Sequence, residues 1–276
     1  MKPGVVFISG GMSGIGRGLV GAYLQCGADV AVFDLVCDGS PPQDMEKQKG
    51  TARQKILTIS VDVTDFEALD AAIGRATAEL GPPQLAINSA GVQRALPFPR
   101  LSREDFENVV RVNMFGSRNF AAALLPRMEP GSRLALIASM AGFTANYSYA
   151  AYSASKFGVV GLGKVLRLEY KPRGLHVSLI CPPEVDTPMV VAERLEMHPV
   201  SRQLKAMAGT LSVDEAVRAI VAGLDAGRDV IIPGKKAKMT YLLGRYLPDV
   251  LLNLVVDRIV RAGLGANDSD KQRADQ

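Results

Sequence analysis

The stretch VVFISGGMSGIG, at positions 5–16, decides the fold. Its first four residues are apolar and mostly β-branched, which predicts a strand buried on both faces of a sheet. A glycine-rich turn follows, and a helical pattern then runs to Gln25 and ends at Gly27. A strand, a glycine-rich turn and a helix in this order predict the start of a βαβ unit.

The glycine turn indicates a nucleotide site. Gly10, Gly14 and Gly16 form a G-x-x-x-G-x-G variant of the dinucleotide fingerprint, in which glycine lets the backbone approach a pyrophosphate at the helix N-terminus. Tight packing between strand and helix can also require such glycines, but their place directly after the first strand favours the nucleotide interpretation. We therefore expect cofactor contacts from Gly10, Met12, Ser13, Gly14, Ile15 and Gly16.

Strands and helices alternate beyond this turn. Further strands are predicted at 29–34, 56–61, 85–87, 134–138, 174–181 and 229–232, and one long helix is predicted from Ser102 to about Met128. This order predicts an α/β fold: a single-domain, doubly wound Rossmann sheet of about seven parallel strands with helices on both faces. Ligands bind such sheets at the carboxyl ends of the strands. We assign residues 1–232 to the dinucleotide-binding and catalytic part, and 233–276 to an amphipathic, basic extension of the same domain that ends in a polar tail.

Composition narrows the classes of function. With 3 cysteines at no metal-ligand spacing and 2 histidines, the chain predicts no metal centre. It shows no secretory leader, which favours a cytoplasmic protein. The net charge of +4 arises between Pro233 and Arg261, where six basic residues meet two acidic ones. No nucleic-acid-binding motif accompanies this charge, so we expect no nucleic-acid partner.

Tyr152 and Lys156 form the first candidate for chemistry. Four residues apart, they lie on one face of a helix, and a protonated lysine would lower the tyrosine pKa from about 10. The phenol would then exchange a proton near neutral pH. Ser139, at the end of the strand at 134–138, would hold a substrate oxygen facing this phenol. The same spacing also occurs on ordinary helix surfaces, and a strand-end serine is often only a turn residue.

Asp34 bears on the choice of cofactor. It ends the second strand, where a carboxylate can bind the adenosine ribose hydroxyls and would repel a 2′-phosphate. A helix cap or a solvated turn residue is the other interpretation. Arg17 lies inside the helix after the turn and need not reach the ribose, so we predict NAD rather than NADP. Further contacts with the adenosine portion are predicted after the third and fourth strands, from Asp62, Val63, Asn88, Ala90 and Gly91.

Together these pieces resemble the classical short-chain dehydrogenase/reductase family along residues 4–232. The family's T-G-x-x-x-G-x-G corresponds to the turn that begins at Ser9, with serine for threonine, and its N-N-A-G corresponds to NSAG at 88–91. The resemblance implies a seven-stranded sheet, a nicotinamide cofactor and a homodimer or homotetramer. It also implies an active-site tetrad of Asn113, Ser139, Tyr152 and Lys156.

The resemblance gives each member of the tetrad a role. Tyr152 is the acid/base, Ser139 orients the substrate oxygen, Lys156 lowers the tyrosine pKa and holds the nicotinamide ribose, and Asn113 positions a water of the proton relay. Pro182, Val185 and Thr187 fall on the nicotinamide side. The family's Pro-Gly is here Pro182-Pro183, and Pro183 cannot supply an N–H or adopt the positive φ of glycine, so this loop is stiffer.

The Pro-Pro variant and the tail together resemble the 3-ketodihydrosphingosine reductase branch. Those enzymes use NADPH, which conflicts with Asp34, so the branch contributes only the expectation of a lipid-like substrate. No apolar run in the tail reaches the 18 or so residues that span a bilayer. Two amphipathic segments separated at Pro248 could cover the substrate cleft, pack against a partner subunit, or lie on an anionic membrane through residues 235–261.

These observations predict an NAD(P)-dependent oxidoreductase. It would transfer a hydride between nicotinamide and a secondary alcohol or ketone, with Tyr152 exchanging the proton. Two alternatives stay open: a non-catalytic NAD-binding sensor or scaffold, and a membrane-peripheral lipid reductase. A scaffold has no need of the tyrosine–lysine pair. The substrate itself is not predicted, because the pocket residues near 92–100, 140–149 and 184–211 are expected in loops.

Overall fold

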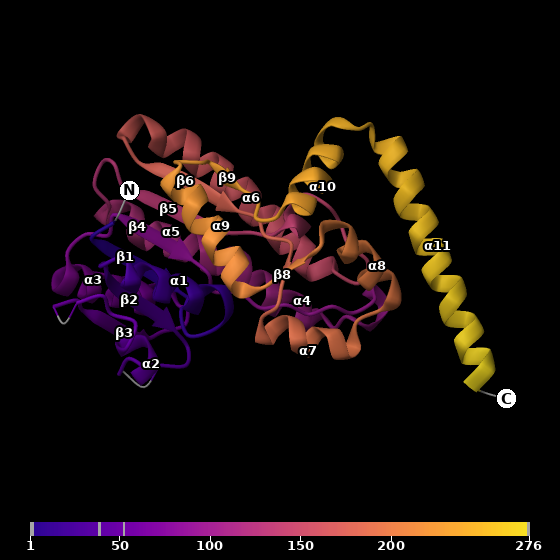
Figure 1. The fold of residues 1–276 in the computed structure, drawn as a ribbon, viewed down its shortest axis with the longest axis horizontal. Helices are drawn as coiled ribbons and strands as arrows, with labels where there is room; N and C mark the ends of the chain where they lie inside the picture. Colours follow the sequence, from indigo (N-terminus) through magenta and orange to yellow (C-terminus); the bar gives the residue numbers. More distant parts are fainter. Residues whose placement is uncertain (1–2, 38–39, 52, 275–276) are drawn as a thin grey trace.

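A seven-stranded parallel sheet forms the centre of the protein, which we describe from a computed structural model at residues 3–37, 40–51 and 53–274 (Figure 1). The strand order is β3-β2-β1-β4-β5-β6-β9, so the order reverses between β1 and β4. This sheet confirms the predicted α/β class. Its strands are β1 (Val5–Ser9), β2 (Asp29–Asp34), β3 (Ile56–Ser60), β4 (Leu85–Asn88), β5 (Arg133–Ile137), β6 (His176–Ile180) and β9 (Val230–Ile231).

Helices cover both faces of the sheet. On one face α1 (Gly14–Gln25) packs beside α9 (Val213–Asp225); on the other lie α3 (Phe66–Leu80), α5 (Gly116–Leu124) and α6 (Ala150–Tyr170). Successive strand residues enter opposite cores: Phe7 and Phe33 join one buried cluster, whereas Ile8 and Val32 join the other. Because both faces are buried, the strands are apolar throughout rather than alternating. In the polar stretch after β2, the described residues form one short helix, α2 (Gln43–Glu46).

The helix predicted from Ser102 to about Met128 is present, but it is not a regular α-helix throughout. A π-helical segment, Arg111–Phe115, separates α4 (Arg103–Val110) from α5, and a 3-10 turn, Leu125–Arg127, follows. The π-helical segment contains the buried Asn113. Its side chain forms hydrogen bonds with the backbone of Val92. A single π-helical turn inside an α-helix often marks a functional site.

Residues 184–211, expected as a loop, also form regular structure. They contain α7 (Pro188–Glu196) and α8 (Pro199–Ala208), framed by the paired short strands β7 (Glu184–Val185) and β8 (Thr210–Leu211). Proline occupies the first position of each helix, and the side chains of Thr187 and His198 accept from backbone N–H groups as N-caps. These are ordinary helix-start signals. They were missed because the apolar residues of these helices do not form one core-facing stripe: Met189 and Leu204 line a cavity, whereas Leu195 is exposed.

The C-terminal extension forms α10 (Lys235–Tyr246) and α11 (Asp249–Ala274), with the predicted break between them. Figure 1 shows α11 in yellow, running along the outside of the molecule beside α8. Helices α11 and α8 pack closely at Gly263 of α11, where an added Cβ would lie 2.7 Å from Cγ2 of Val200 in α8. Within the described part of the chain, every helix is too short or too polar to cross a bilayer.

Candidate active site

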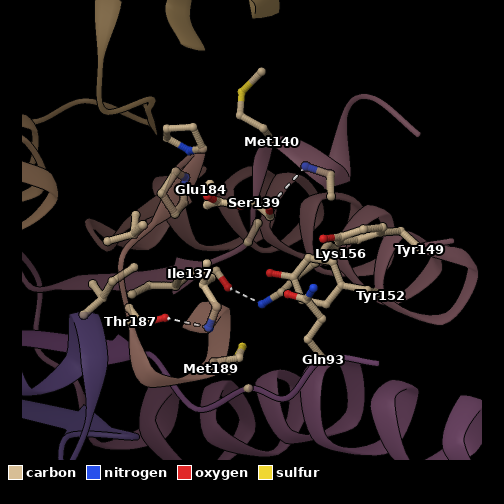
Figure 2. A pocket seen from close by; sticks show the side chains of 18 of the residues that line it. Gln93, Ile137, Ser139, Met140, Tyr149, Tyr152, Lys156, Glu184, Thr187 and Met189 are labelled. Carbon is tan, nitrogen blue, oxygen red and sulfur yellow. Dashed lines mark hydrogen bonds between the residues drawn. The ribbon is translucent and has the colours of Figure 1, made fainter. Parts of the chain in front are cut away.

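A cavity of about 820 Å³ opens at the carboxyl ends of β1, β2, β4, β5 and β6, where the strand order reverses. Parallel sheets bind ligands at this place. One end of the cavity is lined by the glycine turn and Asp34, and the other by residues of α7, α8, α10 and α11. Ser139, Tyr152 and Lys156 also line the cavity, and Figure 2 shows their side chains close to one another.

The glycine turn passes close to the end of β4. Gly10 and Gly14 have φ values of +63° and +51°, and a Cβ on Gly10 would lie 2.6 Å from the backbone nitrogen of Ala90. A Cβ on Gly16 would lie only 2.0 Å from the carbonyl oxygen of Gly10, so this glycine is required by packing. Of the predicted turn contacts, Gly10, Ser13, Gly14 and Ile15 line the cavity, whereas Met12 and Gly16 do not.

The carboxylate of Asp34 lines the same end of the cavity. Its Oδ2 accepts from the backbone N–H of Met12 at 2.9 Å, and its Oδ1 accepts from that of Val36 at 3.3 Å. Arg17 is directed elsewhere: its guanidinium pairs with Asp44 and donates to the carbonyl oxygen of Met12 at 3.3 Å. The charge presented to a ligand at this end is therefore negative.

The other predicted cofactor residues divide into two groups. Those that line the cavity are Asp62, Val63, Ala90, Gly91, Pro182, Val185 and Thr187. Asn88 does not line it. This side chain is fully buried behind the cavity wall, where its amide donates to Ser117 at 2.8 Å and accepts from Ser9. Its role in the structure is to tie β1 and β4 to α5.

Asn113 and Lys156 come together beside Gly91. A Cβ on Gly91 would lie 3.2 Å from Oδ1 of Asn113 and 3.6 Å from Nζ of Lys156, so glycine leaves room for both. The Asn113 side chain accepts from the N–H of Val92 at 2.8 Å and donates to its carbonyl oxygen at 2.9 Å. It also donates to Oγ of Ser155 on α6 at 2.9 Å. Asn113 thus fixes the loop after β4 against the helix that carries Tyr152.

Tyr152, Ser139 and Lys156 meet at the centre of the cavity (Figure 2). The Ser139 hydroxyl lowers the pKa of the Tyr152 phenol, and it accepts from the N–H of Ala141 at 3.1 Å. The Lys156 ammonium donates to the carbonyl oxygen of Ile137 at 3.0 Å and lies 5.5 Å from the centroid of the Tyr152 ring. Three members of the predicted tetrad, Ser139, Tyr152 and Lys156, therefore line the cavity, whereas Asn113 is fully buried behind its wall at Gly91.

The prediction that Lys156 lowers the tyrosine pKa is wrong for this structure. Burial raises the pKa of Tyr152 above its ordinary value, and the Ser139 hydrogen bond and the charge of Lys205 offset only part of that rise. Burial also lowers the pKa of Lys156 to about 8. The lysine is desolvated and directed at Ile137, so it does little for the phenol. Tyr152 is therefore protonated at neutral pH.

Four side chains not predicted to act together form a buried group beside Tyr152, which we call the roof cluster: Tyr149, Glu184, Glu193 and Lys205. The Lys205 ammonium lies 3.0 and 3.1 Å from the two carboxylate oxygens of Glu193 and 3.0 Å from the Tyr149 hydroxyl. It also pairs with Glu184. The rings of Tyr149 and Tyr152 meet edge to face with their centroids 5.9 Å apart. The cluster joins α7 and α8 to the loop that precedes Tyr152.

The far end of the cavity is apolar. Its lining there comes from Phe143, Met189, Val190, Leu204, Met207 and Ala208, and from Leu243, Leu252 and Val256 of the C-terminal helices. Of the arrangements expected for the extension, covering the cleft is therefore confirmed. No spacing in the sequence reveals this contact, because α10 and α11 reach the cavity only through the tertiary fold.

Comparison with known proteins identifies the family of this chain. A model described as short chain dehydrogenase matches residues 4–198. A 3-dehydrosphinganine reductase of Arabidopsis thaliana is 33% identical over 229 residues, which cover 81% of this chain and 67% of that protein.

Two solved structures share the fold. A short chain dehydrogenase from Mycobacterium paratuberculosis, bound to NAD, has a TM-score of 0.75 at 24% identity, covering 86% of this chain and 98% of its own. Another, from Burkholderia cenocepacia in complex with NADP, has a TM-score of 0.73 at 25% identity, covering 91% of this chain and 96% of its own. The family match, the seven-stranded sheet and the relatives agree: the chain belongs to the short-chain dehydrogenase family of oxidoreductases.

Proposed function

We propose that the protein is an NAD-dependent oxidoreductase that interconverts a secondary alcohol and a ketone on a lipid-like substrate. One observation carries the proposal. Tyr152, Ser139 and Lys156 line one cavity together with the glycine turn and Asp34 at one end and mostly apolar side chains at the other. Residues 1–232 carry the dinucleotide site and the catalytic side chains, and residues 233–276 extend the same domain over the substrate end.

The cavity suits a nicotinamide dinucleotide. Backbone without side chains faces it at Gly10, Gly14 and Gly91, next to the start of α1, and a carboxylate faces it at Asp34. This carboxylate accepts the hydroxyls of an unmodified ribose and repels a 2′-phosphate, which favours NAD. Further contacts come from Asp62, Val63 and Ala90 on the adenosine side and from Pro182, Val185 and Thr187 on the nicotinamide side. When bound, NAD supplies the acceptor or donor of the hydride.

The tetrad handles the proton. In reduction, the protonated Tyr152 donates to the carbonyl oxygen of the substrate while Ser139 holds that oxygen, and in oxidation the phenolate takes the proton back. Lys156, with a pKa near 8, would hold the nicotinamide ribose. Asn113 keeps the loop at Val92 in place and positions a water of the relay. A sensor or scaffold would have no need of a tyrosine, a serine and a lysine in one cavity.

The substrate proposal rests on the apolar end of the cavity. A long hydrocarbon chain fits between α7, α8 and the C-terminal helices, with its polar end at Tyr152. The similarity to 3-dehydrosphinganine reductases makes 3-dehydrosphinganine, a long-chain amino ketone, the first compound to try.

The test is a turnover assay with the purified full chain. We expect 3-dehydrosphinganine to be reduced with loss of NADH absorbance, and NADH to be used more efficiently than NADPH. Absence of turnover across long-chain ketones and alcohols, despite tight NAD binding, would favour a sensor or scaffold instead.

We also propose that the protein is cytoplasmic and contacts membranes peripherally through residues 235–261. The outward face of α11 exposes Val250, Leu251, Leu254 and Val255, while its Leu252 and Val256 line the cavity. Basic residues flank this apolar strip, at Lys235, Lys236, Lys238, Arg245, Arg258 and Arg261. An apolar strip with basic flanks suits the surface of an anionic bilayer.

A homodimer or homotetramer is proposed as the assembled form. An exposed apolar strip on α6 supports it: Phe157, Val165 and Leu168 are 46%, 49% and 68% exposed, spaced along one side of the helix. Apolar strips of this kind are usual at subunit interfaces. Sedimentation of the wild-type chain should give a dimer or tetramer, and Leu168→Glu should shift it toward the monomer; a monomeric wild type would refute the assembly.

A further inference from the structure

A second cation besides Lys156 lines the active-site cavity: Lys205 of α8, which belongs to the roof cluster. Its ammonium lies 3.0 Å from the Tyr149 hydroxyl and 5.6 Å from the centroid of the Tyr149 ring. That ring meets the Tyr152 ring edge to face, with the two centroids 5.9 Å apart, and Figure 2 shows the two tyrosines beside each other. Lys205 is thus linked to the ring of Tyr152 through one side chain.

Lys156 is poorly placed to stabilise a charge on the phenol of Tyr152. Its ammonium donates to the backbone carbonyl of Ile137 at 3.0 Å, and burial lowers its pKa to about 8, so that its charge is half lost near pH 8. Burial raises the pKa of Tyr152 itself, and the Ser139 hydroxyl and the charge of Lys205 oppose that rise. The electrostatic support for this phenol therefore comes from α8 as well as from the strand end at Ser139.

The charged groups around Lys205 are fixed by the fold. Glu193 of α7 and Glu184 of β7 both pair with it, and their side chains are only 5% and 7% exposed. Arg194 of α7 pairs with Glu184 as well. An ammonium favours a nearby phenolate, whereas carboxylates oppose it. The charge that acts on Tyr152 therefore depends on which members of this group are present.

We propose that Lys205 is an electrostatic positioning residue of the active site: its ammonium, linked to Tyr152 through Tyr149, stabilises the phenolate that Tyr152 forms when it gives up its proton. The inference rests on the proposed function, in which Tyr152 exchanges a proton with the substrate oxygen. It assigns to α8 a task that the family resemblance gives to Lys156. Reduction then leaves a phenolate near an ammonium, and oxidation starts from the same pair.

The test follows the ionisation of Tyr152 by fluorine NMR of the full chain labelled with 3-fluorotyrosine. The resonance that is missing from Tyr152→Phe belongs to Tyr152, and its shift against pH gives the midpoint of ionisation. Lys205→Met should raise this midpoint by about 0.5 to 1 pH unit, because the two carboxylates remain without the ammonium. Lys205→Arg keeps the charge and should titrate close to the wild type.

Glu193→Gln supplies the opposite change of charge. It removes one carboxylate but keeps an acceptor for the Tyr149 hydroxyl, which donates to Glu193 in the wild type. The midpoint of Tyr152 should therefore fall, by about 0.5 pH unit. Loosened packing of the cluster does not move these two variants in opposite directions. Arg202→Met, which removes an exposed cation of the same helix, is the control and should keep the wild-type midpoint.

Three outcomes would overturn the inference: no shift in either variant, shifts of the same sign in Lys205→Met and Glu193→Gln, or an equal rise in Arg202→Met. If Lys205→Met does not fold, a midpoint in Glu193→Gln at or above the wild-type value is enough to reject it. The titration needs neither substrate nor turnover. Its failure is therefore distinct from failure of the proposed function, which the turnover assay decides.

Discussion

Burial of the Lys156 ammonium, a candidate catalytic group, lowers the stability of the folded protein. Its ammonium is buried and has one protein hydrogen bond, to Ile137, and burial lowers its pKa from 10.5 to about 8. A folded-state pKa below the unfolded value means that the charged lysine destabilises the protein at pH below 8. This cost fades as the pH rises from about 8 toward 10.5, because the unfolded chain then binds the proton that the folded chain has lost.

The first prediction follows from this cost. Lys156→Met should raise the free energy of unfolding by about 1–3 kcal/mol near neutral pH while abolishing turnover. The gain should shrink in denaturant titrations repeated near pH 10, where the wild-type lysine is largely neutral. Lys164→Met, on the exposed side of the same helix, should change little at either pH. An equal gain at both pH values would mean that desolvation of the ammonium is not its cause.

The second prediction concerns Asp34. Asp34→Ser removes the charge that faces the adenosine end, so the preference for NADH over NADPH should fall by about 10- to 100-fold. Fluorescence titration with both cofactors measures this directly. Asp214→Ser, at an exposed position on α9, serves as the control. If the wild type binds NADPH more tightly than NADH, the role given to Asp34 is mistaken.

The roof cluster shows how α7 and α8 are held over the site. Lys205 is 15% exposed and pairs with two carboxylates, Glu184 and Glu193, that are 7% and 5% exposed. Removing the lysine would leave two buried carboxylate charges without a cation beside them. The free energy lost in this way exceeds the net contribution of the ion pairs. The cluster also links these helices to Tyr149, and so to the loop before Tyr152.

The third prediction tests this link. Lys205→Met should lower the free energy of unfolding by about 2–4 kcal/mol and raise KM for long-chain substrates, because α7 and α8 line the apolar end of the cavity. Arg103→Met breaks an exposed helical pair with Glu107 and should have little effect on either quantity. Equal losses in the two variants would contradict a special role for the cluster.

At the scale of single elements, the sequence predicted some features well and others poorly, for physical reasons. The strand, glycine turn and helix at 5–25 were predictable because their signals are local. The π turn at Asn113 was not, since it depends on a bond to Val92, distant in the chain. The apolar residues of α7 and α8 are divided between a cavity and the surface and form no single core-facing stripe, although Pro188 and Pro199 mark the first turns of these helices. The pKa of Tyr152 depends on burial, which spacing alone does not report.

The whole molecule has an outer face formed by α11 and an inner cavity beneath it. The basic and apolar pattern of 235–261 indicated amphipathic helices, but which side would face the protein depended on the packing of α8 against α11. In the structure one side of α11 lines the cavity and the other is exposed. A lipid bound to the membrane could thus lie close to the cavity that would receive it.

The fourth prediction tests contact with the membrane. A Val250→Ser and Leu254→Ser double variant should lose sedimentation with vesicles that contain phosphatidylserine, because both side chains belong to the exposed strip of α11. Binding of the wild type should also weaken as salt is raised. Phe98→Ser with Leu195→Ser changes two other exposed apolar residues and should sediment like the wild type. Identical sedimentation of all three proteins would exclude this surface as the contact.

The central claim is that Tyr152 transfers the proton. Its most direct test is single-turnover reduction of 3-dehydrosphinganine by Tyr152→Phe, together with fluorescence titration of NADH binding. Removing one hydroxyl from a packed ring should leave the fold and NADH affinity intact while slowing the reaction by at least about 100-fold. A Tyr152→Phe variant that binds NADH normally and reduces the ketone at close to the wild-type rate would contradict the account.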